Sequence, residues 1–118
     1  MAFWNCIENE GALHQVLASS EEKPVFILKH SFRCALSAMA KNRIEKNADD
    51  RLVYSLVDVV KDREISNMLS EIYSVQHESP QAFLIIKSKL IEVKSHLAIR
   101  SQAFSVLLDS FEGENAQP

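Results

Sequence analysis

The hydrophobic pattern of the chain alternates between short continuous apolar runs and longer stretches of helical periodicity. Two apolar runs, residues 25–30 and 52–60, are rich in β-branched side chains and predict strands covered on both faces, as in a parallel sheet. Two further runs, residues 82–87 and 90–96, are close enough in the chain to predict an antiparallel hairpin. Apolar side chains recur at helical spacing in residues 11–20, 35–46, 62–75 and 101–111.

Each of the last three predicted helices has an apolar stripe that we expect in the core. The stripes are Leu36, Met39 and Ile44; Ile65, Met68, Leu69 and Ile72; and Phe104, Leu107, Leu108 and Phe111.

The predicted order is helix, strand, helix, strand, helix, strand, strand, helix. A parallel βαβ half followed by a ββα half, with a cysteine after the first strand, is the thioredoxin-like arrangement. We therefore expect an α/β fold with a central four-stranded mixed sheet flanked by helices. Residues 1–111 should form a single domain, and the polar residues 112–118 a disordered tail.

Composition and charge limit the kinds of partner that the protein is expected to bind. The chain of 118 residues has 47% hydrophobic and 25% charged residues and a net charge of −3, which is ordinary for one globular domain. It has no block of lysine and arginine, so we expect no nucleic-acid partner. No apolar run approaches the ~20 residues needed to span a bilayer, and the first residues lack a basic leader. We therefore expect a cytoplasmic protein with no membrane role.

Cys34 lies between the apolar run at residues 25–30 and the helix predicted from residue 35. A helix start presents unpaired N–H groups and a partial positive charge, and both favour a thiolate over a thiol. Arg33 and His30 add cationic or donor groups next to the sulfur. This position therefore predicts a nucleophilic cysteine.

Ser37 stands where a dithiol oxidoreductase has its second cysteine, so the motif is Cys-x-x-Ser. Serine cannot form an internal disulfide, so an adduct on Cys34 would have to pass to a second thiol from solution. The motif thus indicates a low-molecular-weight thiol as cosubstrate, and we expect no tightly bound cofactor.

Two other residues leave alternatives open. Cys6, beside Trp4 and Ile7, is expected to be a small core-filling side chain, and the alternative is a resolving partner for Cys34. Asp58 ends the second predicted strand, where it either caps the following turn or assists proton transfer to a leaving thiol. We favour the cap.

Three local strings accompany the Cys34 motif: residues 29–31 (Lys-His-Ser), 37–40 (Ser-Ala-Met-Ala) and 75–81 (Val-Gln-His-Glu-Ser-Pro-Gln). Together they resemble the YtxJ family, and the similarity covers nearly the whole chain from Trp4 to the last helix. YtxJ-like proteins are regarded as monothiol bacilliredoxins. The resemblance implies a thioredoxin fold that removes bacillithiol, a cysteinyl-glucosamine-malate thiol, from oxidised protein cysteines.

The resemblance also implies roles for single residues. Cys34 would be the nucleophile, Ser37 the replacement for a resolving cysteine, and Pro80 the cis-proline that faces the nucleophile. The Ser79 backbone would then be free to pair with an extended substrate. One departure is Ala35, which stands where the familiar pattern has proline, so the first helical turn is less rigidly preset.

The remaining polar candidates have a functional and a plainer interpretation. Arg33 either meets a carboxylate of the malate group and stabilises the thiolate, or is a solvated loop cation. His30 and His77 are expected near Cys34, as thiolate partners or as ordinary hydrogen-bonded loop histidines. No Cys-x-x-Cys or His-x-x-x-His spacing indicates a metal site, and we expect none.

The sequence therefore predicts a monothiol thiol–disulfide exchange protein that uses Cys34. Its expected partners are S-thiolated client proteins and either a small thiol or a disulfide reductase. The main alternative is a non-catalytic thioredoxin-like binding module that uses the groove beside Pro80. A third possibility is iron–sulfur cluster carriage, although the Cys-Gly-Phe-Ser motif of monothiol glutaredoxins is absent.

Overall fold

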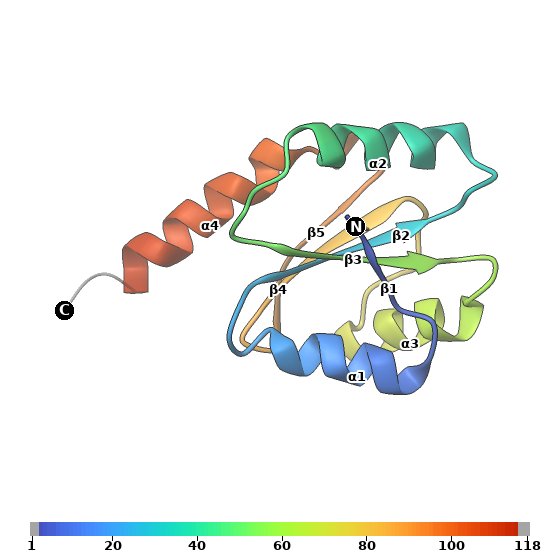
Figure 1. The fold of residues 1–118 in the computed structure, drawn as a ribbon, viewed down its shortest axis with the longest axis horizontal. Helices are drawn as coiled ribbons and strands as arrows, with labels where there is room; N and C mark the ends of the chain where they lie inside the picture. Colours follow the sequence, from blue (N-terminus) through green and yellow to red (C-terminus); the bar gives the residue numbers. More distant parts are fainter. Residues whose placement is uncertain (1–2, 116–118) are drawn as a thin grey trace.

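A mixed β-sheet forms the centre of the computed structural model, which describes residues 3–115, and helices cover both faces of the sheet (Figure 1). Helices α2 and α4 lie on one face, and α1 and α3 lie on the other. The elements are β1 (Asn5–Cys6), α1 (Glu10–Ser19), β2 (Val25–His30), α2 (Ala35–Lys46), β3 (Val53–Asp58), α3 (Arg63–Tyr73), β4 (Gln81–Ile86), β5 (Lys89–Ser95), the 3₁₀ turn η1 (His96–Ala98) and α4 (Ser101–Asn115).

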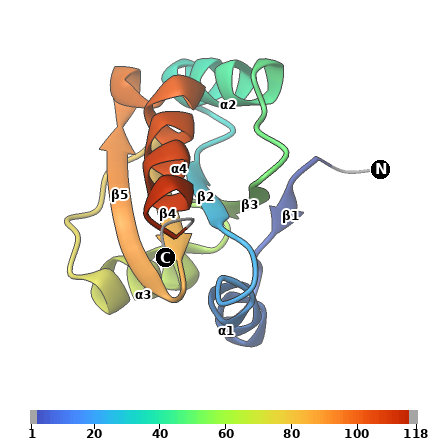
Figure 2. The same cartoon turned by 90° about the vertical axis from the view of Figure 1, so that its left-hand side faces the viewer.

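The strands lie side by side in the order β1-β3-β2-β4-β5 (Figure 2). Strand β3 runs parallel to both β1 and β2, whereas β4 is antiparallel to β2 and β5. The expected sheet of four strands was one strand short. The missing strand β1 has two residues, both exposed, and is too short to produce a periodic pattern.

Strand β2 is buried at all six positions, as the continuous apolar run predicts. Its side chains alternate between two core clusters. Phe26 and Leu28 pack towards α2 and α4, and Val25 and Ile27 pack towards α1 and α3. The strand that leads to Cys34 is therefore held between two packed layers.

Two of the expected helical stripes are wrong in part. On α2, Leu36 and Met39 are 50% and 53% exposed, and the buried side chains are Ser37, Ala40 and Ile44. On α3, Ile72 is 45% exposed. Helix α2 packs on the sheet mainly through small side chains, which allow a close approach, and its larger apolar side chains Leu36 and Met39 remain exposed.

Helix α4 continues past residue 111, where the sequence pattern ends, to Asn115. The rest of the expected polar tail, residues 116–118, lies outside the described residues. None of the described helices combines the length and the apolarity needed to cross a membrane.

The hairpin turn consists of Lys87 and Ser88, one residue earlier than the sequence predicts. Both residues have positive φ, 51° and 65°, which is the backbone of a two-residue turn that usually contains glycine or asparagine. Ser20 stabilises the turn, because its carbonyl accepts from Lys87 N and its hydroxyl accepts from Ser88 N, both at 2.8 Å. Tertiary contacts thus replace the missing turn signal.

Candidate active site

Three chain segments meet at one end of the sheet, where the parallel strands β2 and β3 finish. Strands β2 and β3 end in register, with His30 opposite Asp58, so the loops that follow them start side by side. Strand β4 enters at the same end, because Lys29 pairs with Gln81 in the antiparallel ladder. The Ser79–Pro80 peptide bond just before it is cis. The strand pairing therefore places the segment around Pro80 next to the loop that carries Cys34.

Cys34 is the N-cap residue of α2, with extended backbone angles of φ −114° and ψ 122°. Its N–H donates to the Ser31 carbonyl at 3.2 Å, and its own carbonyl accepts from Ala38 N at 3.1 Å. The thiol is free and partly exposed. The side chain thus stands at the positive end of the helix, as the sequence predicts, with access to solvent.

The environment of Cys34 lowers the pKa of its thiol below the ordinary value. The backbone N–H of Ser37 has the largest effect. Burial raises the pKa by a smaller amount, and the Leu36 backbone and the Ser37 hydroxyl lower it further. The thiolate is therefore stabilised by the first turn of α2, through the donors that a helix start leaves unpaired.

Ser37 is fully buried beneath the Cys34 loop. Its hydroxyl accepts a hydrogen bond from Ser31 N at 3.3 Å, which ties the loop to the first turn of α2. Ser31 in turn accepts from Arg33 N at 3.4 Å. Ser37 therefore shapes the loop in addition to occupying the place of a second cysteine.

Arg33 matches the plainer of its two interpretations, a solvated loop cation, whereas within the described residues His30 is neither a thiolate partner nor a hydrogen-bonded loop histidine. Arg33 is exposed, and its guanidinium has no partner among the described side chains. His30 is 2% exposed, and its ring packs edge-on against Phe32 with centroids 4.3 Å apart. Burial and then the charge of Lys41 lower the pKa of His30, which keeps the imidazole neutral at neutral pH. Neither side chain forms a hydrogen bond with the Cys34 sulfur.

His77 lies on the segment between α3 and β4, and its partner is Lys29 rather than Cys34. The two side chains are joined at 3.1 Å, between Lys29 Nζ and His77 Nδ1. Two residues further on, the buried Ser79 hydroxyl has no hydrogen-bond partner within the described chain. The Ser79 backbone N–H and carbonyl also form no backbone hydrogen bond within residues 3–115, so they are free to pair with another chain.

Sequence reasoning gave too little weight to Lys29, a fully buried lysine one residue before the end of β2. The signal was present in the strand pattern, because Lys29 lies on the same face as Val25 and Ile27 in a strand covered on both sides. A cation at such a position needs specific partners.

Two smaller expectations have clear outcomes. Asp58 caps its turn, since its Oδ1 accepts from the backbone N–H groups of Val60 and Lys61, both at 3.0 Å. The favoured interpretation of Asp58 is therefore confirmed. Cys6 is exposed on β1, and the expectation of a core-filling side chain is wrong, because β1 is a two-residue edge strand whose residues are both exposed.

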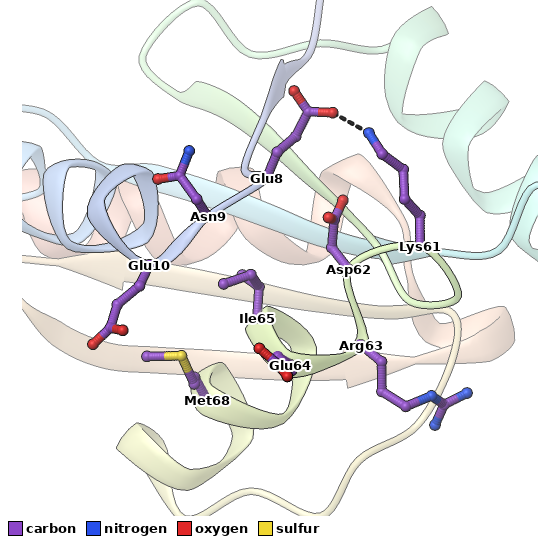
Figure 3. A pocket seen from close by; sticks show the side chains of 9 residues that line it. All are labelled: Glu8, Asn9, Glu10, Lys61, Asp62, Arg63, Glu64, Ile65 and Met68. Carbon is purple, nitrogen blue, oxygen red and sulfur yellow. Dashed lines mark hydrogen bonds and ion pairs between the residues drawn. The ribbon is translucent and has the colours of Figure 1, made fainter.

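A recess with no direct link to Cys34 lies between the starts of α1 and α3 (Figure 3). It measures about 400 Å³ and mixes acidic and basic side chains, with Lys61 paired to Glu8 across its rim. It contains no cysteine. Among the described residues no group of three histidine, cysteine or acidic side chains could hold a metal ion.

The lowered thiol pKa predicts a pH profile. Alkylation needs the thiolate, so the iodoacetamide rate of Cys34 should fall as the pH drops through the pKa of the folded protein, which lies below that of the unfolded chain. At pH 7 the folded protein should react several-fold faster than the same chain in denaturant. The gain is moderate, because each tenfold increase in thiolate is offset about threefold by the lower nucleophilicity of the less basic sulfur.

The measurement is made in the Cys6→Ser background, where Cys34 is the single thiol. The thiolate also contributes to stability at pH values above the unfolded-state pKa, and this contribution is lost as the pH falls through the folded-state pKa. A folded-state midpoint equal to or above the midpoint in denaturant would contradict the assigned role of the helix start.

A free, partly exposed cysteine at the start of the helix after β2, with a cis-proline just before β4 at the same end of the sheet, defines a thiol–disulfide oxidoreductase of the thioredoxin fold. The family model of the monothiol bacilliredoxin BrxC matches residues 5–104. The chain belongs to this family, which confirms the resemblance seen in the sequence.

Solved structures agree on the fold. A protein described as having a thioredoxin fold is 28% identical, with a TM-score of 0.77 over 85% of this chain and 88% of its own. Thioredoxin from Trypanosoma brucei brucei is 12% identical, with a TM-score of 0.74 over 92% of this chain and 91% of its own. Thioredoxin from Malassezia sympodialis is 18% identical, with a TM-score of 0.70 over 90% and 89%. The predicted thioredoxin-like fold is confirmed.

Proposed function

We propose that the protein removes a low-molecular-weight thiol, such as bacillithiol, from oxidised cysteines of client proteins. The observation that carries this proposal is the single sulfur of Cys34, with a lowered thiol pKa and with Ser37 where a dithiol protein would have its resolving cysteine. A thiolate without an internal partner attacks a mixed disulfide readily but keeps the resulting adduct.

The exchange has two balanced steps. The Cys34 thiolate attacks the small-thiol sulfur of the client's mixed disulfide, the old S–S bond breaks, and the client leaves as a thiolate. Cys34 is then disulfide-bonded to the small thiol. A second small-thiol thiolate, or a reductase thiolate, attacks this disulfide and releases Cys34 as a thiolate again.

A protein client is supported by the surface around the nucleophile. Four large apolar side chains are exposed there, on the Cys34 loop, on α2 and on η1, whose His96 N–H donates to the Pro80 carbonyl at 3.1 Å. They are Phe32 (66% exposed), Leu36 (50%), Met39 (53%) and Leu97 (61%). Large apolar side chains exposed on the elements around a nucleophile favour contact with another macromolecule. The unpaired Ser79 backbone adds a place for an extended client segment to pair.

For the small thiol we propose Arg33 as the partner of a carboxylate. A recess of about 280 Å³ beside the Cys34 loop includes Lys41, but this lysine is already bound to Glu45 at 2.7 Å. The Arg33 guanidinium is exposed next to Cys34 and has no partner among the described side chains, and its planar fork fits a carboxylate.

We place this reaction in a reducing compartment such as the cytoplasm. Support comes from the two cysteines, which are both free in the structure. Such a compartment would also supply the small thiol or the reductase that regenerates Cys34.

The function is tested by following one small thiol by mass spectrometry. A client with a single cysteine carrying bacillithiol is mixed with the protein reduced beforehand. We expect the client to lose the bacillithiol mass and Cys34 to gain it, and free bacillithiol then to restore the thiol. A client that keeps its adduct while Cys34 stays unmodified would overturn the proposal.

The same experiment tests Arg33. Arg33→Gln should slow the regeneration of Cys34 by bacillithiol about five- to tenfold, as expected for the loss of one charge-assisted contact. Regeneration by 2-mercaptoethanol, which has no carboxylate, should be unchanged. Lys46→Gln is the matched control, because it removes an exposed cation at the end of α2 that is far from Cys34. Equal effects of both variants would contradict the assignment to Arg33.

A further inference from the structure

Lys29 is a lysine side chain with no exposure to solvent, located between the layers of the fold. It stands on β2, one residue before the end of the strand, on the face that packs against α3, and its Nζ lies 5.6 Å from the centre of the Phe83 ring. Burial of an amine is costly unless hydrogen bonds compensate for the lost water. No described carboxylate forms an ion pair with Lys29, so its partners must be neutral groups.

Those partners come from two parts of the chain. Nζ donates to the Ser70 hydroxyl of α3 at 2.5 Å and lies 3.1 Å from Nδ1 of His77. The Ser66 hydroxyl, also on α3, lies 3.4 Å from the same histidine nitrogen. The amine therefore joins the central strand β2 to helix α3 and to the segment between α3 and β4.

The charge states fit this contact. Burial lowers the pKa of Lys29 to about 8. Burial, and then the charges of Lys29 and Arg63, lower the pKa of His77, and Glu78 opposes them. At neutral pH the imidazole is therefore uncharged, and Nδ1 can accept a hydrogen bond from the amine.

The segment that carries His77 is held at a second point. Gln81, at the start of β4, is 2% exposed. Its Nε2 donates to the Gln76 carbonyl at 2.9 Å, and its Oε1 accepts from Glu78 N at 3.4 Å. Because Lys29 and Gln81 are paired in the sheet, both anchors stand on neighbouring strands at the end of the sheet where Cys34 lies. Ser79 and Pro80 connect the segment held by the two anchors to β4.

We propose that Lys29 is a positioning residue for thiol exchange, which acts by holding His77 and with it the segment of Ser79 and Pro80 beside Cys34. The inference rests on the proposed function, since it takes this segment as the place where a client chain pairs. It also accounts for two of the local strings in the sequence, residues 29–31 and 75–81, because one supplies the amine and the other its acceptor.

Two variants break the contact from opposite ends. Lys29→Met keeps the buried hydrocarbon chain and removes the donor, and His77→Ala removes the acceptor from an exposed position without opening a core cavity. Each should raise the KM for a mixed-disulfide client roughly tenfold, the effect of one hydrogen bond in a binding segment. The maximal rate and the alkylation rate of Cys34 should stay unchanged, because α2 alone sets the thiolate.

The double variant distinguishes positioning from general destabilisation. If Lys29 acts through His77, the KM of Lys29→Met with His77→Ala should rise no further than the KM of either single variant.

Hydrogen exchange gives a readout that needs no activity. The amides of residues 76–82 should exchange faster in both single variants, and the amides of α2 should not. The control His14→Ala changes an exposed histidine on α1 and should leave every readout as in the wild type.

Wild-type KM and wild-type exchange of residues 76–82 in His77→Ala would overturn the inference, and so would losses that multiply in the double variant. His77→Ala supplies this test even if Lys29→Met does not fold. Faster exchange in both variants supports the anchoring even where the wild type fails to take bacillithiol from a client, a failure that would instead overturn the proposed function.

Discussion

Cys34→Ser is expected to abolish removal of bacillithiol from a client, with a loss of at least about 1,000-fold in rate. A serine hydroxyl stays protonated at neutral pH and cannot form a disulfide, so neither the attack nor the covalent intermediate remains. The start of α2 should be preserved, because Cys34 makes its cap contacts through its backbone and its side chain makes no capping hydrogen bond. The measurement is the rate at which the client loses its adduct, with circular dichroism to compare the folds.

Cys6→Ser is the matched control for this prediction, since it makes the same exchange of atoms at the only other cysteine, which is exposed on β1. It should keep the wild-type rate. Full activity of Cys34→Ser would show that the Cys34 sulfur takes no part in the reaction. Undiminished binding of a client peptide by Cys34→Ser, together with no adduct transfer by the wild type, would favour the binding module instead.

The position of the nucleophile could be predicted because it depends on local signals. A strand buried on both faces needs a continuous apolar run, and residues 25–30 have one apart from their last two positions. The helix after it begins at Ala35, as the periodicity indicates. These two boundaries alone place Cys34 at a helix start, and the lowered thiol pKa follows from that position.

The orientation of α2 could not be predicted from hydrophobicity. Leu36 and Met39 are its most apolar large side chains near the start, but the helix buries Ser37 and Ala40. Periodicity gives the spacing of a stripe and not the distance at which a helix packs. Where a helix start lies close to a sheet, small side chains face inwards, and the large ones remain available for a partner.

The surroundings of Cys34 needed the structure because they depend on contacts distant in sequence. Lys29 and His77 are separated by 48 positions, and no local pattern pairs them. The sequence therefore left two roles open for His77, and the structure agrees with the hydrogen-bonded loop histidine, whose partner is Lys29. A lysine in a strand covered on both faces indicates a buried amine. The sequence does not indicate which residue is the partner of that amine.

Ser37→Cys is expected to convert the protein from a monothiol into a dithiol mechanism. Ser37 lies three residues after Cys34, and its hydroxyl already acts on the Cys34 thiol and helps lower its pKa. Residues at this spacing share one side of a helix, so a thiol introduced there would attack the Cys34 adduct directly. After reaction with a loaded client, the variant should carry an internal disulfide and no bacillithiol, as judged by its intact mass.

The adduct on Cys34 should then disappear at least about 100-fold faster than in the wild type without added thiol, because an intramolecular attack replaces a bimolecular one. Asn42→Cys is the matched control: it adds the same thiol to an exposed position two turns further along α2, out of reach of Cys34, and its adduct should persist. An adduct equally long-lived in Ser37→Cys would mean that the buried face of α2 does not present position 37 to the sulfur. The absence of a resolving thiol would then not explain the need for a small-thiol cosubstrate.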